Sequence, residues 1–240
     1  DGVRYGIMAS APAGGDILFD EKLCELGRNF CNKVWNALRL VKSWQVDPSL
    51  PHDDGRAIAI LWMKSRLSEV DTELRRHYQQ FRLSEGVTSL YSFVWDDFCS
   101  VFLEVIKPAY GEASDQKSYD ATLELFEEIC KLLHPFMPFL TEEIWQIIAE
   151  RTPEEALIIA QWPELKSFNQ NAITDFENAI EVISGIRTIR KDKNIPFKDT
   201  IELKTINNEK FSTYHDVVIV KLGNLSSLEY ISEKVEGALS

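Results

Sequence analysis

The residues best suited to chemistry lie on one predicted helix. The segment from Leu26 to Gln45 carries four Lys or Arg residues and no acid, although the whole chain has a net charge of −12. When the segment is projected at about 100° per residue, one group of side chains clusters nearly opposite the apolar stripe: Arg28, Asn32, Trp35, Arg39 and Lys42. Asn29 and Asn36 flank this group, and Lys33 lies in the same segment.

This helix face has an unusual composition for a surface. A solvated helix face normally mixes Glu with Lys, whereas this one offers cations, amides and an indole. Such groups can hold phosphates, read base edges and stack on bases, so the face predicts contact with RNA. Two other interpretations stay open. In one, the face packs on another helix, with Trp35 in the core and the asparagine side chains bonded to buried backbone; in the other, it meets a further domain.

Other reactive side chains do not form a recognisable catalytic group. The four histidines fall in separate predicted elements, and the sequence contains no glycine-rich phosphate loop. Asp96, Asp97 and Glu104 could form a carboxylate cluster, but the favoured interpretation pairs them with cations of the bundle or exposes them to solvent. We therefore expect no catalytic residue within this chain.

The four cysteines lack a C-x-x-C pair and a histidine at metal-ligand spacing. We interpret them as small buried hydrophobic residues in a reducing compartment, and we predict neither a metal site nor a bound cofactor.

A second basic segment contains Arg187, Arg190, Lys191 and Lys193, at the end of a predicted helix. Cations at a helix C-terminus interact favourably with the helix dipole and so stabilise the helix. We prefer that simple stabilising role over phosphate contact, which remains the alternative.

The elements that must position these residues are helices, predicted at 20–44, 54–83, 88–106, 115–134 and 141–148. Asp20 is a suitable N-cap for the first, and Ser84 to Gly86 is expected to separate the second from the third. Pro135 and Pro138 are expected to break the chain before the last. The third helix is apolar nearly all round, which predicts that it lies centrally with Trp95 and Phe98 buried.

The pattern changes after residue 163. We predict a helix at 170–192, a strand at 200–206, a helix at 211–222 and a strand at 227–231. The expected fold is mainly α: an antiparallel helical bundle at 20–165, a connector at 1–19 and a small α/β appendage at 166–240. No apolar run approaches the roughly 20 residues that span a bilayer, and no signal peptide is visible. Because the chain lacks an initiator Met, we interpret it as a fragment.

Three stretches, at 28–39, 90–104 and 132–145, carry a resemblance to a known family. They read RNFCNKVWNALR, LYSFVWDDFCSVFLE and LLHPFMPFLTEEIW. In this order and spacing they resemble the anticodon-binding region of class I aminoacyl-tRNA synthetases for branched aliphatic amino acids. Within that family, segments 12–20 and 186–196 look like those of the valine-specific enzymes. The isoleucine-specific branch and a helical scaffold that binds only protein remain alternatives.

The resemblance implies a role for this chain within a longer enzyme. The intact enzyme would charge tRNA(Val) with valine using ATP and Mg, as a cytoplasmic monomer with catalytic and editing domains elsewhere in the same polypeptide. This chain would hold no catalytic, cofactor or metal residue and would not contact a membrane. Its expected tRNA-binding residues are Arg28, Asn32, Lys33, Trp35, Asn36, Arg39 and Lys42.

Overall fold

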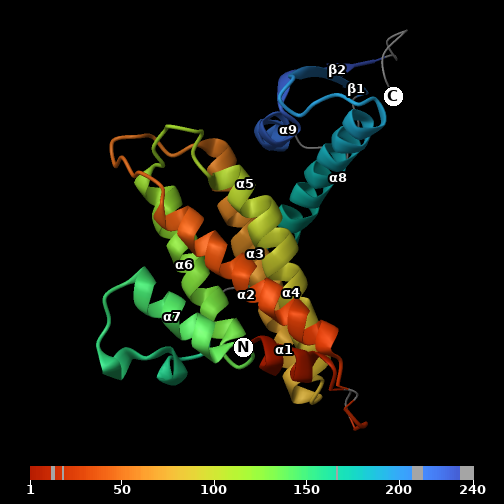
Figure 1. Cartoon of the computed structure of the whole chain (residues 1–240). Coiled ribbons are helices and arrows are strands. Elements are labelled where there is room, and N and C mark those ends of the chain that lie inside the picture. Colours follow the sequence, from red (N-terminus) through yellow and green to blue (C-terminus); the bar gives the residue numbers. More distant parts are fainter. Residues whose placement is uncertain (12–13, 18, 166, 207–212, 233–240) are drawn as a thin grey trace.

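A computed structural model describes the chain except residues 12–13, 18, 166, 207–212 and 233–240. It is a helical bundle with a small C-terminal appendage, as predicted (Figure 1). The helices of the bundle are α1 (Gly2–Ala9), α2 (Glu21–Lys42), α3 (Asp54–Gln79), α4 (Leu83–Ser92), the π-helical η1 (Phe93–Phe102), α5 (Leu103–Ile106), α6 (Gln116–Leu133) and α7 (Pro138–Ile148). They are followed by the 3-10 turns η2 (Pro153–Glu155) and η3 (Leu157–Ile159), then α8 (Gln170–Asp192), β1 (Ile201–Ile206), the 3-10 turn η4 (Thr213–His215), α9 (Asp216–Gly223) and β2 (Leu225–Ile231).

Helix α2 is close to its predicted extent and crosses the front of the bundle in Figure 1. The Asp20 side chain accepts a hydrogen bond from the Lys22 backbone N–H at 2.9 Å, so it is the N-cap that the sequence indicates. The apolar stripe of the helix is buried, with Phe30 and Val41 fully enclosed. The opposite face of α2 is consequently directed to solvent.

The turn between α3 and α4 differs from the prediction. Residues Ser84 to Gly86 belong to α4, and the reversal occurs before them, where Phe81 adopts a φ of 57°. A Cβ on Gly86 would lie 3.0 Å from the Leu74 side chain. The glycine therefore allows α4 to approach α3 closely instead of ending a helix, which is why a break was wrongly expected there.

The central stretch 83–106 is helical throughout but widens to a π-helix in η1. Phe98 is fully buried, in edge contact with Phe126 at 4.9 Å between ring centroids, as the bundle prediction requires. The expectation that Trp95 is buried beside it was wrong. Trp95 is only partly buried. It lies at the edge of the contact between η1 and α2, where its ring stacks on that of Tyr91, which is itself partly exposed.

The acids of this central stretch have ordinary partners. Asp97 accepts hydrogen bonds from the Arg66 guanidinium at 2.9 and 3.1 Å, and Glu104 pairs with Lys107 at 2.7 Å. Asp96 is exposed. The preferred interpretation, acids paired with bundle cations or facing solvent, is confirmed.

Two of the four cysteines depart from the expected burial. Cys99 and Cys130 are buried, and burial raises the pKa of the Cys99 thiol to about 12. Cys24 and Cys31 are partly exposed, because they lie near the edge of α2 where α1 crosses it. A Cβ on Gly6 of α1 would lie 2.6 Å from the Cys24 sulfur, so this crossing is very close.

The start of α6 joins three parts of the bundle. Asp115 is the N-cap and accepts from the Ser118 N–H at 2.9 Å. The same carboxylate accepts from Arg56 of α3 at 2.9 Å and lies 3.0 Å from His52 Nδ1. At the other end of α6, Pro138 does not extend the break as expected but is the first residue of α7, where a missing N–H is tolerated.

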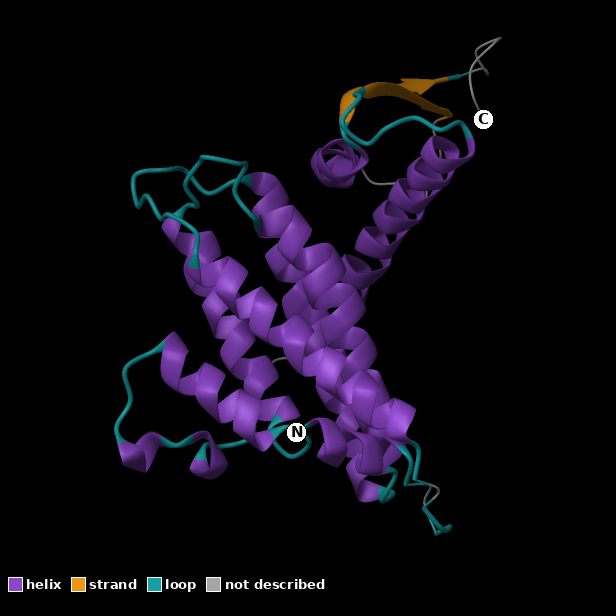
Figure 2. Ribbon diagram, viewed as in Figure 1, coloured by secondary structure: helices purple, strands orange, loops and turns teal. Residues whose placement is uncertain are grey.

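The appendage is carried by α8 at the upper right of the bundle (Figure 2). Strands β1 and β2 pair in parallel, with Ile206 opposite Ile231, and α9 packs on α8. The helix predicted at 211–222 corresponds to α9, which begins at Asp216. The first two predicted residues, 211–212, lie outside the described residues.

Arg190 of α8 is buried beneath this appendage. Its guanidinium donates to the carbonyls of Pro196, Asp199, Gly223 and Asn224. Arg187, Lys191 and Lys193 are exposed. The second basic segment is therefore not one cluster: Arg190 stabilises the appendage by hydrogen bonding, rather than only through the dipole of its own helix.

No helix in the described part of the chain is long and apolar enough to cross a membrane. Within the same residues, no three His, Cys, Asp or Glu side chains are grouped so that they could hold a metal ion.

Candidate nucleic-acid interface

The exposed side of α2 carries most of the predicted RNA-binding residues. Five of the seven are solvent-exposed, and Asn29 is exposed beside them. We call this set the outer face of α2: Arg28, Asn29, Asn32, Asn36, Arg39 and Lys42. Within the described residues, none of these side chains makes an ion pair or a hydrogen bond. The alternative in which the asparagines bond to buried backbone is not what the structure shows.

The unpaired state of these cations contrasts with that of several basic residues elsewhere in the bundle. Arg56, Arg66 and Arg151 each pair with a carboxylate. Cations that have no internal partner can exchange water and counterions for phosphate without breaking a native contact. Since an α-helix rises about 1.5 Å per residue, the outer face of α2 extends for about 21 Å from Arg28 to Lys42.

Lys33 and Trp35, the other two predicted residues, are only partly exposed. Trp35 packs against the core, which is where one of the alternative interpretations placed this side chain. The Lys33 ammonium lies 5.2 Å from the centroid of the Trp95 ring, a cation–π contact with η1. Both residues consequently border the outer face of α2 and do not lie at its centre.

An aromatic pair beside Lys33 was missed by sequence reasoning. Tyr91 and Trp95 stack with ring centroids 5.4 Å apart and an interplanar angle of 18°, and both are partly exposed. The available signal was the pair of acids immediately after Trp95, which indicates that this turn of an apolar helix reaches the surface. The pair widens the candidate interface from a basic helix face to a basic and aromatic one.

The four histidines do not converge. His134 Nδ1 lies 2.8 Å from the Thr141 hydroxyl, at the start of α7, and burial lowers its pKa. His52 contacts Asp115 in another part of the bundle, and His77 lies 3.4 Å from Glu73 on its own helix. His215 is buried in the appendage, where burial lowers its pKa too. The imidazoles of His52, His77 and His134 each have a local hydrogen-bond partner, whereas that of His215 packs against the Phe176 and Tyr214 rings.

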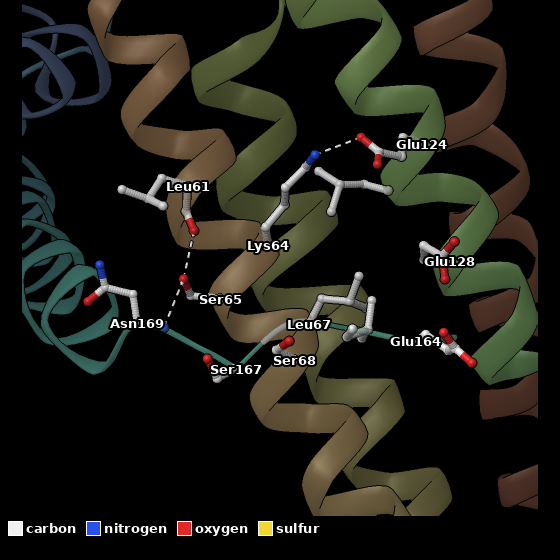
Figure 3. Close-up of a pocket in the computed structure, with 12 residues that line it drawn as sticks. Leu61, Lys64, Ser65, Leu67, Ser68, Glu124, Glu128, Glu164, Ser167 and Asn169 are labelled. Carbon is white, nitrogen blue, oxygen red and sulfur yellow. Dashed lines mark hydrogen bonds and ion pairs between the residues drawn. The ribbon is translucent and has the colours of Figure 1, made fainter. Parts of the chain in front are cut away.

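A cavity of 370 Å³ lies between α3, α6 and the chain after residue 163 (Figure 3). Three carboxylates line it, those of Glu124, Glu128 and Glu164. Lys64 is paired with Glu124 at 2.6 Å. The net charge of this lining is negative, so it repels phosphate and is a poor place for a nucleic acid. The charge distribution thus favours the outer face of α2.

Comparison with known proteins adds a family to this geometry. Residues 61–205 match the anticodon-binding domain of tRNA ligase. The whole chain is 52% identical to a valine–tRNA ligase of Christiangramia forsetii and 45% identical to one of Porphyromonas gingivalis, covering 27% of each. A valine–tRNA ligase of Zymomonas mobilis is 34% identical over 82% of this chain. The chain therefore spans about a quarter of the length of these relatives, and α2 lies within the regions aligned to the first two.

Proposed function

The chain belongs to the anticodon-binding domain family of tRNA ligases, and we propose that it is the part of a valine–tRNA ligase that holds the anticodon arm of tRNA(Val). The observation that supports this most is the outer face of α2, where exposed cations and amides have no partner within the described residues. Family membership alone does not select a surface, and this charge arrangement is the support for choosing the outer face of α2.

The chemistry of the proposed contact follows from the side chains. Arg28, Arg39 and Lys42 would hold backbone phosphates, and each would release counterions on binding. The asparagines between them carry a donor and an acceptor, the groups needed to bond to the edges of unpaired bases. The face is rigid because the buried side of α2 is locked into the core, so little ordering is required when RNA binds.

In the intact protein, this function would serve the ATP- and Mg-dependent charging of tRNA(Val) with valine, in the cytoplasm and as a monomer. The catalytic and editing domains would be further parts of the same polypeptide, joined through residues 1–19. Helix α1 in that segment is packed tightly on α2, because Gly6 and Gly27 permit close approach. A firm α1–α2 contact would fix the direction of the interface relative to a catalytic domain.

Binding of isolated RNA hairpins tests the proposal. We expect the chain to bind the anticodon stem-loop of tRNA(Val) more tightly than an acceptor-stem hairpin of equal length and charge. Binding affinity is measured by fluorescence anisotropy at several salt concentrations. The salt-sensitive, nonspecific part of the affinity should be the same for the two hairpins, and the preference for the anticodon stem-loop should persist as salt rises. Stem-loops from isoleucine and unrelated tRNAs measure the specificity. Equal binding of all hairpins would contradict an anticodon site, and absence of binding would favour a scaffold for protein partners.

A further inference from the structure

The cavity of 370 Å³ beside α3 and α6 has an apolar floor (Figure 3). Leu67 of α3 and Leu125 of α6 line it and are buried. The exposed Leu61 and the partly buried Leu165 extend this apolar lining. The volume falls at the lower end of the range of pockets that hold small ligands. Such a lining suits the hydrocarbon part of a small molecule.

One carboxylate oxygen in this cavity is buried without a partner. Glu128 projects from α6 toward the cavity in Figure 3, and its side chain is largely buried. Its Oε1 atom accepts a hydrogen bond from the Lys131 ammonium at 2.8 Å. Its Oε2 atom is shielded from solvent and has no hydrogen-bond partner among the described residues. A buried charged oxygen without a donor is costly, so a ligand that brings a donor is favoured here.

The rest of the lining adds negative charge. Glu124 and Glu164 are exposed, and Glu124 pairs with Lys64 at 2.6 Å. Glu164 makes no ion pair or hydrogen bond with another described residue. The lining thus combines three carboxylates with one ammonium group, and its field attracts cations. Within the described chain these carboxylates are not grouped as ligands of one metal ion, so an organic cation with a hydrocarbon body matches the cavity better than a bare ion.

The chain that covers the cavity is loosely packed on α3. Asn169 is the N-cap of α8 and accepts a hydrogen bond from the Ala172 N–H at 3.2 Å. Its own N–H donates to the Ser65 hydroxyl at 3.4 Å, which is a long hydrogen bond. A second hollow, of 310 Å³, shares Leu165 and Ser167 with the first. A ligand in the cavity would therefore tie the segment that leads into α8 to the bundle.

We propose that this cavity binds a small alkylammonium ion, with the ammonium group at Glu128 and Glu164 and the hydrocarbon chain on the leucines. An ammonium group has three donors, which is enough to satisfy the buried Oε2 atom and a second carboxylate. The apolar floor then covers the alkyl chain. The inference goes beyond the proposed function, because none of these residues belongs to the outer face of α2.

Hexylamine is the probe for this site, and hexanol and hexanoate are its neutral and anionic counterparts of the same length. A titration followed by NMR of the chain with labelled leucine methyl groups gives both affinity and location. Hexylamine should shift the methyl signals of Leu67 and Leu125 and bind at least about tenfold more tightly than hexanol or hexanoate, because of its charge-assisted hydrogen bonds. Butylamine, which is two methylenes shorter, should bind about 5- to 20-fold more weakly than hexylamine.

Variants of α6 separate the carboxylate from the ion pair that it makes. Glu128→Gln keeps the shape of the side chain but removes its charge, so it should weaken hexylamine binding about tenfold and leave hexanol binding unchanged. Lys131→Ala breaks the same ion pair but keeps the carboxylate, and it should bind hexylamine at least as tightly as wild type. Asp120→Asn removes an exposed acid elsewhere on α6 and should bind like wild type. Thermal melting should show that each variant folds.

Glu164→Gln changes an exposed position, so it tests the same ammonium contact if Glu128→Gln is unfolded. It should weaken hexylamine binding about 3- to 10-fold. The inference is wrong if hexylamine leaves the Leu67 and Leu125 signals unchanged, if hexanol binds equally well, or if Glu128→Gln or Glu164→Gln folds and keeps the wild-type affinity. Displacement of hexylamine by Mg²⁺, but not by Na⁺ at equal ionic strength, would indicate a metal site and would also overturn it.

Discussion

Replacing Asp115 with alanine is expected to lower the free energy of unfolding by about 3–5 kcal/mol, because it breaks a buried ion pair and removes a helix cap. The Asp115 side chain is 2% exposed and that of its partner Arg56 is 12% exposed. Without the carboxylate, the guanidinium stays buried with no counter-charge, and the Ser118 N–H loses its acceptor. Urea denaturation followed by circular dichroism measures the change.

Asp120→Ala is the matched control, since Asp120 lies on the same helix but is exposed. Its substitution should alter stability by no more than about 0.5 kcal/mol. If the two variants are equally stable, Asp115 does not anchor the bundle as its contacts indicate. A milder variant, Asp115→Asn, keeps an acceptor for the cap and should fall between them.

The same carboxylate predicts a pH dependence. Burial alone would raise the pKa of Asp115, but hydrogen bonds from Ser118, Arg56 and His52 outweigh it and hold the pKa well below its usual range. A carboxylate with a lowered folded-state pKa stabilises the fold above its unfolded-state pKa of about 3.9 and loses that contribution as pH falls further. The stability gap between wild type and Asp115→Asn should therefore narrow below about pH 4.

Replacing Arg190 with alanine is the second large perturbation, expected to destabilise the appendage by about 3 kcal/mol through loss of charge-assisted hydrogen bonds. The guanidinium donates to the Asp199 carbonyl at 2.8 Å and to the Gly223 and Asn224 carbonyls at 3.1 and 3.0 Å. These acceptors belong to the loop after α8 and to the end of α9. Their release should loosen β1 and β2 before the bundle unfolds.

Hydrogen exchange resolved along the chain checks this prediction. Amides of β1 and β2 should exchange faster in Arg190→Ala, while those of α3 and α6 should keep their protection. Arg187→Ala removes an exposed cation one turn earlier and should leave exchange unchanged. Arg190→Lys should restore only part of the protection, because an ammonium group cannot reach all four carbonyls. If the amides of β1 and β2 exchange at the same rate in Arg190→Ala as in Arg187→Ala, Arg190 does not hold the appendage.

The helices of this chain could be predicted from the sequence where one local signal dominated. The cap at Asp20 and the apolar stripe of α2 placed that helix within two residues of its ends. The predicted position of the α3–α4 reversal was wrong because the chain turns at Phe81, which adopts the left-handed conformation although it is neither Gly nor Asn. Gly86, where the break was expected, instead allows close packing of α4 on α3. The π-helical η1 was not predicted, since its widened turns depend on packing around Phe98.

The candidate site was readable for a different reason. An absence of acids over 20 residues is visible in sequence, and it selected the side chains of α2 that the structure leaves exposed and unpaired. Trp35 and Lys33 belong to the border because their contacts are tertiary. Tyr91 and Trp95 could not be assigned to the same surface, because their position depends on how η1 meets α2.

The measurement that tests the central claim most directly is the salt dependence of stem-loop binding by variants of the outer face of α2. Arg39→Ala and Lys42→Ala should each weaken binding and lower the slope of log affinity against log salt by about 1, as loss of one phosphate contact predicts. Asn32→Ala should weaken binding by about 1–3 kcal/mol while leaving that slope nearly unchanged, because a base contact releases no counterion.

A control and a folding check complete this series. Lys131→Ala removes a cation from α6 that pairs with Glu128, and it should keep both the affinity and the salt slope of wild type. Melting curves should confirm that every variant is folded. If Arg39→Ala, Lys42→Ala and Asn32→Ala all fold normally and bind with the affinity and slope of wild type, the outer face of α2 does not bind the anticodon arm.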